Sequence, residues 1–99
     1  MRGIIWYQNF TIGLNKFENL IQDYKRINIE VIKTVSRKHN QTVYFSNGDI
    51  WELVCANESS RGKSCNIGLF EYGLSEELIN TVLMPCVKLY PYQAYNFYG

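Results

Sequence analysis

The order of hydrophobic and polar positions divides the chain into short segments of strand and helix. Residues 3–7 (GIIWY) form an apolar run of β-branched and aromatic residues, which is typical of a buried strand. Apolar residues then recur at intervals of three or four between Phe10 and Ile27, as on one face of a helix. Asn9 or Thr11 is placed to cap its first turn. We therefore expect a strand followed directly by an amphipathic helix.

Three strand candidates follow this helix, at residues 30–37, 42–46 and 49–56. They are rich in β-branched and aromatic residues and are separated by short polar segments. A polar loop at residues 58–64 then leads to a further strand at residues 66–72, which a glycine ends. The middle of the chain is therefore expected to be mainly sheet.

The Asn-Gly dipeptide between the strands at 42–46 and 49–56 predicts a hairpin with a two-residue type I′ turn. A turn of that length makes Phe45 face Ile50 and Tyr44 face Trp51. Because side chains alternate between the two faces of a sheet, Phe45 and Ile50 are expected on one face and Tyr44 and Trp51 on the other.

A second helix and an aromatic tail complete the chain. Ser75 is placed to cap the helix, with Glu76 and Glu77 in its first turn. Pro85 lacks an amide hydrogen, so the helix is expected to end or kink there. The tail, residues 88–99, is expected to close the core or to join two subunits. Its candidate interface residues are Tyr90, Tyr92, Tyr95, Phe97 and Tyr98.

These segments give the order β-α-β-β-β-β-α, which indicates a small α/β domain with a mixed sheet and two helices. Ninety-nine residues are enough for a single domain, which we place at residues 1–99 with the aromatic tail as its last part. Hydrophobic residues make up 46% of the chain and aromatic residues 15%, as expected of an ordered globular protein rather than a disordered one.

The charge is nearly balanced, with ten Lys and Arg against nine Asp and Glu. No overall field therefore attracts nucleic acid or acidic membranes, and such a partner would need a local patch. Arg37 and Lys38 in one polar turn, and Arg61 and Lys63 in another, would form that patch if both loops lie at one end of the sheet. Nearby aromatic side chains would then add stacking on single-stranded nucleic acid.

Cysteine and histidine usage points away from metal binding. Cys55, Cys65 and Cys86 include no C-x-x-C pair, and the one histidine, His39, lies in a polar turn where we expect it to be solvated. We expect three reduced thiols in a cytoplasmic protein, with no metal and no cofactor; a Cys55–Cys65 bridge is the alternative. No apolar stretch approaches the ~18 residues of a membrane helix, and the first apolar run is too short for a signal peptide.

Gly62-Lys63-Ser64 matches the end of the phosphate-loop pattern G-x-x-x-x-G-K-[ST]. The leading glycine of that pattern is replaced by Asn57. The residues after Ser64 predict a strand, whereas a phosphate loop needs a helix whose N-terminus points at the anion. A connecting loop is therefore favoured. The alternative is a vestigial nucleotide site formed by Arg61, Gly62, Lys63 and Ser64.

The run FSNGDIWELVCA at residues 45–56, followed by ESSRGKSCNIGLFEY at residues 58–72, resembles part of the large terminase subunit of tailed phages. In that ATPase family, a hairpin of the form F-x-N-G-S-x-I is followed by an R-G loop and by a strand leading to the acidic pair of the Walker B motif. The resemblance covers about residues 3–86. The matching residues here are Phe45, Asn47, Gly48 and Ile50 in the hairpin, Arg61-Gly62 in the loop and Ile67 to Phe70 in the strand.

Departures from the family pattern decide the expected function. The resemblance places Glu71 at the magnesium-ligand position and Tyr72 at the catalytic-base position, and a tyrosine does not polarise water as a carboxylate does. The family's phosphate loop lies before the matched region. We therefore expect a non-enzymatic protein of phage or prophage origin that acts through a protein partner or through self-association. A nucleic-acid-binding accessory protein is the second alternative, and the vestigial nucleotide binder is the third.

Overall fold

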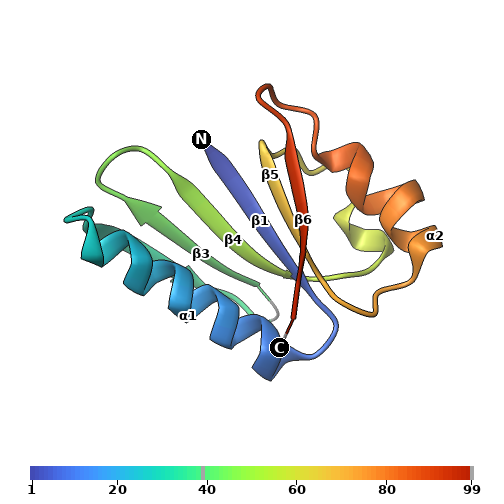
Figure 1. Ribbon diagram of the computed structural model, residues 1–99, viewed down its shortest axis with the longest axis horizontal. Helices are drawn as coiled ribbons and strands as arrows, with labels where there is room; N and C mark the ends of the chain where they lie inside the picture. Colours follow the sequence, from blue (N-terminus) through green and yellow to red (C-terminus); the bar gives the residue numbers. More distant parts are fainter. Residues whose placement is uncertain (39, 99) are drawn as a thin grey trace.

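The computed structural model describes residues 1–38 and 40–98, so the prediction for His39 lies outside the described residues. Within them, the chain forms one mixed sheet in the order β2-β3-β4-β1-β5-β6 (Figure 1). The strands are β1 (Arg2–Tyr7), β2 (Val31–Ser36), β3 (Asn40–Phe45), β4 (Ile50–Cys55), β5 (Ile67–Glu71) and β6 (Gln93–Phe97). The predicted α/β class, with a mixed sheet and two helices, is confirmed.

Strand β1 lies at the centre of the sheet and is buried on both faces. It pairs in parallel with β4 on one side and with β5 on the other, and β5 pairs in parallel with β6. Strands β2 and β3 extend the sheet beyond β4 as antiparallel neighbours. Ile4, Ile5, Trp6 and Tyr7 are all buried. A parallel strand covered on both faces needs a continuous apolar run, and this explains the sequence of β1.

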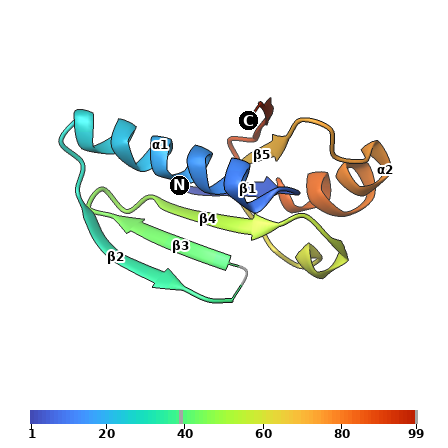
Figure 2. The same ribbon diagram turned by 90° about the horizontal axis from the view of Figure 1, so that it is seen from below.

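One face of the sheet is covered by α1 (Phe10–Arg26), as Figure 2 shows. Asn9 caps this helix, because its side-chain oxygen accepts a hydrogen bond from the Ile12 amide at 3.2 Å. Its apolar stripe packs over β1 and β4, where Phe17 is buried among residues of those strands. The helix predicted from the spacing of apolar residues is therefore present, and it ends with Arg26.

The opposite face is covered, beside β1 and β5, by a second helical segment. It begins as one α-helical turn, α2 (Glu76–Leu78), continues as a π-helical turn, η2 (Ile79–Leu83), and ends as a 3-10 turn, η3 (Met84–Cys86). The Ser75 hydroxyl accepts a hydrogen bond from the Leu78 amide at 3.4 Å, as expected of a helix cap. Val82 and Leu83 are buried against Trp6 and Phe70. None of the described helices is long and apolar enough to span a membrane.

The β3–β4 hairpin has a longer turn than the Asn-Gly dipeptide predicts. Gly48, at φ +92°, donates its amide hydrogen to the Phe45 carbonyl, and Phe45 donates to Asp49. Three residues therefore connect the strands, and the register shifts by one, so that Tyr44 pairs with Ile50 and Val43 with Trp51. The predicted pairing of Phe45 with Ile50 was wrong.

This register brings the large apolar residues of the hairpin under α1. Val43, Phe45, Trp51 and Leu53 all belong to the core on that side of the sheet. Phe45 stacks on Tyr24 of α1 with ring centroids 3.8 Å apart. The predicted placement of Tyr44 and Trp51 on the same face is therefore corrected. A two-residue turn would have placed Phe45 and Trp51 on opposite faces.

The C-terminal segment contains a strand that the sequence pattern does not reveal. Residues 93–97 form β6 at one edge of the sheet, in register with β5. Four of its five residues are exposed, and Phe97 alone is buried. The tail that was expected to close the core or to join two subunits is thus partly sheet, because its backbone pairs with the edge of β5. No alternation of apolar and polar side chains was available to predict this.

Gly13 allows the close approach of α1 to β1. A Cβ atom added there would lie 2.5 Å from Cβ of Tyr7. We expect Gly13→Ala to lower the free energy of unfolding by about 1–3 kcal/mol, because the helix must move away from a well-packed strand. This reverses the gain of up to ~1 kcal/mol that alanine gives over glycine inside an exposed helix.

Urea denaturation of the Gly13→Ala variant measures this effect. Asn19→Ala is the control, because Asn19 lies on the exposed side of the same helix. The control should be unchanged or slightly more stable. A Gly13→Ala variant as stable as the control would contradict the close contact.

Candidate functional site

The carboxyl ends of β1 and β5 are where an open α/β sheet of this topology would bind a ligand. The chain passes from β1 into α1 on one face, and from β5 into α2 on the other. Ligands of open α/β sheets bind where successive connections diverge in this way. A ligand would lie between residues 7–9 and residues 71–72.

Glu71 already occupies this position. Its Oε1 atom accepts hydrogen bonds from the backbone amides of Gln8 at 3.0 Å and Asn9 at 2.9 Å. The residue is only 7% exposed. A helix N-terminus attracts negative charge through its free amides and its dipole, and here a carboxylate of the chain itself supplies that charge. The Glu71 carboxylate therefore occupies the position that a phosphate group would take.

Tyr72, which the terminase resemblance places at the catalytic-base position, lies at the surface. Its side chain is 61% exposed, and its ring stacks on Tyr98 with centroids 4.5 Å apart. Its amide donates to the carbonyl of Phe97 and so joins the ends of β5 and β6. Glu71 and Tyr72 thus make different contacts. Glu71 accepts hydrogen bonds from the two residues before α1, whereas Tyr72 is part of an exposed aromatic surface.

The Gly62-Lys63-Ser64 loop does not form a cradle for phosphate. It follows a short turn, η1 (Glu58–Ser60), and leads to strand β5 rather than to a helix. The loop amides donate to oxygen atoms of the chain itself: those of Ser60, Arg61, Lys63 and Cys65 bond to the carbonyls of Asn57, Glu58, Ser60 and Cys86. In a phosphate loop such amides would converge on the anion. The strand predicted after Ser64 is present.

The two basic side chains of this loop point to different neighbours. Arg61 donates to Glu58 at 3.0 Å and to the carbonyl of Thr81 at 3.3 Å, which places it beside η2. Lys63 forms a 2.7 Å ion pair with Glu52 of β4, and both side chains are largely shielded from water. Arg61, Gly62 and Lys63 line one small hollow, but the charged groups of Arg61 and Lys63 are already paired with different neighbours.

The four residues predicted to bind nucleic acid do not form one patch. Arg37 follows β2 and lines a hollow with Glu52, the partner of Lys63. Lys38 lies in the exposed turn after it. Arg61 and Lys63 line a different hollow, together with Thr81. The structure thus keeps Arg61 and Lys63 together and places Arg37 at another hollow, to which Lys63 is linked only through its ion pair with Glu52.

Ser60 has a role that sequence reasoning missed. It is fully buried, and its hydroxyl accepts a hydrogen bond from the indole nitrogen of Trp6 at 3.0 Å. Its carbonyl accepts from the Cys86 thiol at 3.3 Å. The loop expected to be solvated is therefore docked on the core by one residue. A serine in a polar run gives no sequence signal for this contact.

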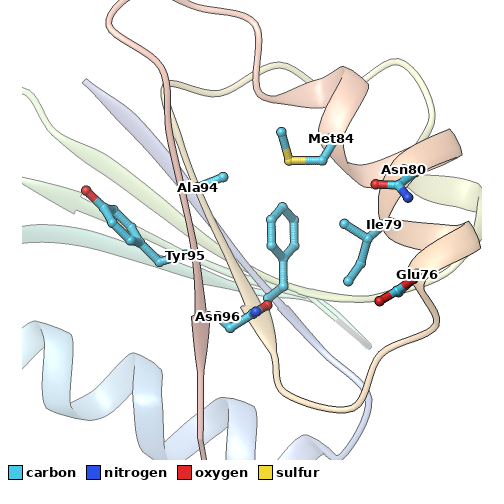
Figure 3. A pocket seen from close by; sticks show the side chains of 8 residues that line it. Glu76, Ile79, Asn80, Met84, Ala94, Tyr95 and Asn96 are labelled. Carbon is cyan, nitrogen blue, oxygen red and sulfur yellow. The ribbon is translucent and has the colours of Figure 1, made fainter.

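The predicted aromatic interface is exposed except for one member. Tyr90, Tyr92, Tyr95 and Tyr98 are 55–84% exposed, whereas Phe97 is 6% exposed and packs under α1. Beside them, a cavity of about 510 Å³ lies between the second helical segment and β6. Figure 3 shows Met84 and Ile79 on one side of this cavity and Ala94 on the other, with Tyr95 directed away from it.

The cysteines are free and two of them are buried. Burial, with a smaller effect from neighbouring Cys86, raises the pKa of Cys65 to about 12. Burial also raises the pKa of Cys86. Both groups are therefore poor nucleophiles, because the thiolate is the reactive form. Among the residues that the structure describes, no three His, Cys, Asp or Glu side chains are grouped to hold a metal ion.

The contact of Glu71 with α1 can be tested by substitution. We expect Glu71→Ala to lower the free energy of unfolding by about 1–3 kcal/mol, because the amides of Gln8 and Asn9 lose a buried acceptor. Glu71→Gln keeps an acceptor oxygen and should lose less. Chemical denaturation of both variants measures this, with exposed Glu77→Ala as control. Equal effects for Glu71→Ala and Glu77→Ala would contradict the assignment.

Among solved structures, the fold is similar to that of the large terminase from a thermophilic bacteriophage. The two structures superimpose with a TM-score of 0.63 at 14% sequence identity. The match covers 96% of this chain and 24% of the terminase chain, so this chain spans about a quarter of that protein. No protein-family model and no curated protein sequence matches the chain. The terminase-like resemblance seen in the sequence therefore holds at the level of the fold.

Proposed function

We propose that this chain is a non-enzymatic, terminase-like protein of phage or prophage origin that acts by binding protein through the outer edge of β6. The simplest form of this contact is a symmetric pair of chains joined edge to edge. The fold it shares with a phage large terminase supports the origin. The observation that carries the proposal is the exposed edge strand with its surrounding tyrosines.

The backbone of β6 offers hydrogen-bonding groups to a partner. Gln93 donates its amide to Asn66, and the Phe97 carbonyl accepts from Tyr72, so these two residues point toward β5. Successive residues of a strand alternate, and Ala94 and Asn96 therefore direct their backbone groups outward. No described strand pairs with that edge. An unpaired strand edge is a template for strand addition.

The side chains around this edge suit a protein contact. Four exposed tyrosines surround this edge, and each presents a large apolar ring with one hydroxyl. Tyr92 lies just before β6, Tyr95 lies on it, and the stacked pair Tyr72 and Tyr98 lies at its end. Tyrosine is enriched in protein interfaces because it combines buried area with a polar group. The cavity beside Ala94 would receive a side chain of the added strand.

The proposal excludes ATP hydrolysis because two parts of that chemistry have no counterpart among the described residues. Glu71 accepts hydrogen bonds from the amides of Gln8 and Asn9 just before α1, and the amide of Lys63 donates to the Ser60 carbonyl rather than facing an anion site. Phosphoryl transfer depends on positioned charges around the phosphates and on a group that orients the attacking water. Tyr72 at the surface does not supply the second group.

The edge contact predicts the mass of the protein in solution. We expect the wild-type chain to elute at twice its 11.6 kDa mass, and Ala94→Lys to elute as a monomer, because a charge would be placed on the shared edge. Ala94→Pro, which removes an outward amide but no bond to β5, should act likewise. Light scattering after size exclusion measures each mass.

Ile32→Lys is the matched control, because Ile32 is exposed on β2 at the other edge of the sheet. This variant should keep the wild-type mass. A monomeric wild-type chain, or an equal effect of Ile32→Lys, would contradict pairing through β6.

Nucleotide binding gives a separate test. Millimolar ATP with magnesium is expected to leave the melting temperature unchanged. A site filled at a hundred times its Kd would add ~2.7 kcal/mol and raise the melting temperature by several degrees. A rise that Lys63→Gln abolishes, and that Lys16→Gln on α1 does not, would instead support the vestigial nucleotide site.

A further inference from the structure

The face of β2, β3 and β4 opposite α1 is a second surface whose role the proposed function leaves open. The second helical segment packs beside β1 and β5, and Figure 2 shows no helix of the described residues over β2 and β3 on this side. A hollow of about 310 Å³ lies here. Its lining combines residues of four strands and one residue of the turn after β2: Arg2, Lys33, Val35, Arg37, Asn40, Thr42, Tyr44 and Glu52. We call this the open face.

Positive charge is concentrated on the open face. Arg2, Lys33 and Arg37 line the hollow, and all three are exposed. They are three of the ten Lys and Arg residues in a chain whose net charge is only +1. Strand pairing fixes their spacing, because Lys33 pairs with Tyr44, Tyr44 with Ile50, and Ile50 with Arg2. With strands ~4.8 Å apart, the Cα atoms of Lys33 and Arg2 at the two ends of this row lie ~14 Å apart.

The one acidic side chain that lines the hollow is neutralised from outside it. Glu52 forms a 2.7 Å ion pair with Lys63, and its side chain is only 15% exposed. An anion on the open face therefore meets three cations and a carboxylate whose charge is already compensated. Charge complementarity favours a ligand with several negative groups spaced along a line.

Tyr44 lies in the middle of the cationic row and is half-buried. The ammonium of Lys33 lies 5.7 Å from the centre of its ring. An aromatic ring on an uncovered sheet face, bordered by Lys and Arg, is the arrangement by which sheet proteins stack unpaired bases. The Tyr44 ring distinguishes this surface from one that would bind phosphate or an acidic peptide by charge alone.

We propose that the open face binds single-stranded nucleic acid, with Arg2, Lys33 and Arg37 contacting phosphates and Tyr44 stacking on a base. This site shares Arg37 with the loop patch predicted from the sequence, but it adds the strand residues Arg2, Lys33 and Tyr44 and excludes Lys38 and Arg61. It is independent of the β6 edge, which lies at the other side of the sheet. Either proposal can therefore fail alone.

The experiment measures binding of a fluorescent oligothymidylate of about 12 nucleotides by anisotropy. Three phosphate contacts on a single strand give a salt slope of about −2, or roughly a 20-fold loss of affinity between 50 and 200 mM salt. The variant R2Q/K33Q/R37Q should lose at least that factor at 50 mM salt and lose most of the salt dependence. Thermal melts confirm that the variants fold.

The triple variant K16Q/K25Q/R26Q is the matched control, because it removes the same charge from α1 on the other face of the sheet. It should bind as the wild type does. Tyr44→Leu should weaken binding at least about fivefold at unchanged charge, whereas Tyr44→Phe keeps a ring and should bind normally. Equal losses in the two triple variants would overturn the proposal.

The pair of Glu52 and Lys63 gives an internal test. Lys63→Gln uncovers the carboxylate and should weaken binding, and the double variant E52Q/K63Q should restore it. A direct phosphate contact by Lys63 would instead leave the double variant weak.

Three further outcomes would contradict the assignment to single-stranded nucleic acid. The first is no binding by the wild type at 50 mM salt. The second is equally tight binding of a DNA duplex or of heparin, which would indicate a surface for polyanions in general. The third is a Tyr44→Leu variant that binds as well as the wild type.

Discussion

The hydrogen bonds from the amides of Gln8 and Asn9 to Glu71 are the contact around which the functional features are arranged. They join the end of β5 to the start of α1 at the place where an α/β sheet would otherwise receive a ligand. A buried carboxylate with two backbone donors is well satisfied, and displacing it would leave a charge without partners. Both surfaces that we propose to be functional therefore lie away from this end of β1 and β5.

Two such surfaces remain, and they have different chemistry. The edge of β6 offers unpaired backbone groups and exposed tyrosines, which suit another protein chain. The open face offers Arg2, Lys33 and Arg37 around Tyr44, which suit a polyanion with bases to stack. They lie toward opposite edges of one sheet. A protein that uses both would hold a nucleic acid strand beside a second chain.

Hydrophobic spacing was a good guide to elements and a poor guide to pairing. The run at β1 and the stripe of α1 each follow from burial, and both appeared where the pattern placed them. The predicted register of the hairpin was wrong because an Asn-Gly pair fits both a two-residue and a three-residue turn. Packing of Phe45 and Trp51 under α1 selects the three-residue turn. Strand β6 was not predicted because an exposed edge strand does not need alternating apolar and polar side chains.

The sequence alone determined the class of fold, the start of the second helix at Ser75 and the absence of a helix after Ser64, since these depend on nearby residues; for the first helix it left Asn9 and Thr11 as alternative caps. Tertiary structure decided which side chains meet. The contacts of Ser60 with Trp6 and of Glu71 with the start of α1 join residues more than fifty positions apart. Such contacts depend on the order and register of strands, which no local pattern encodes.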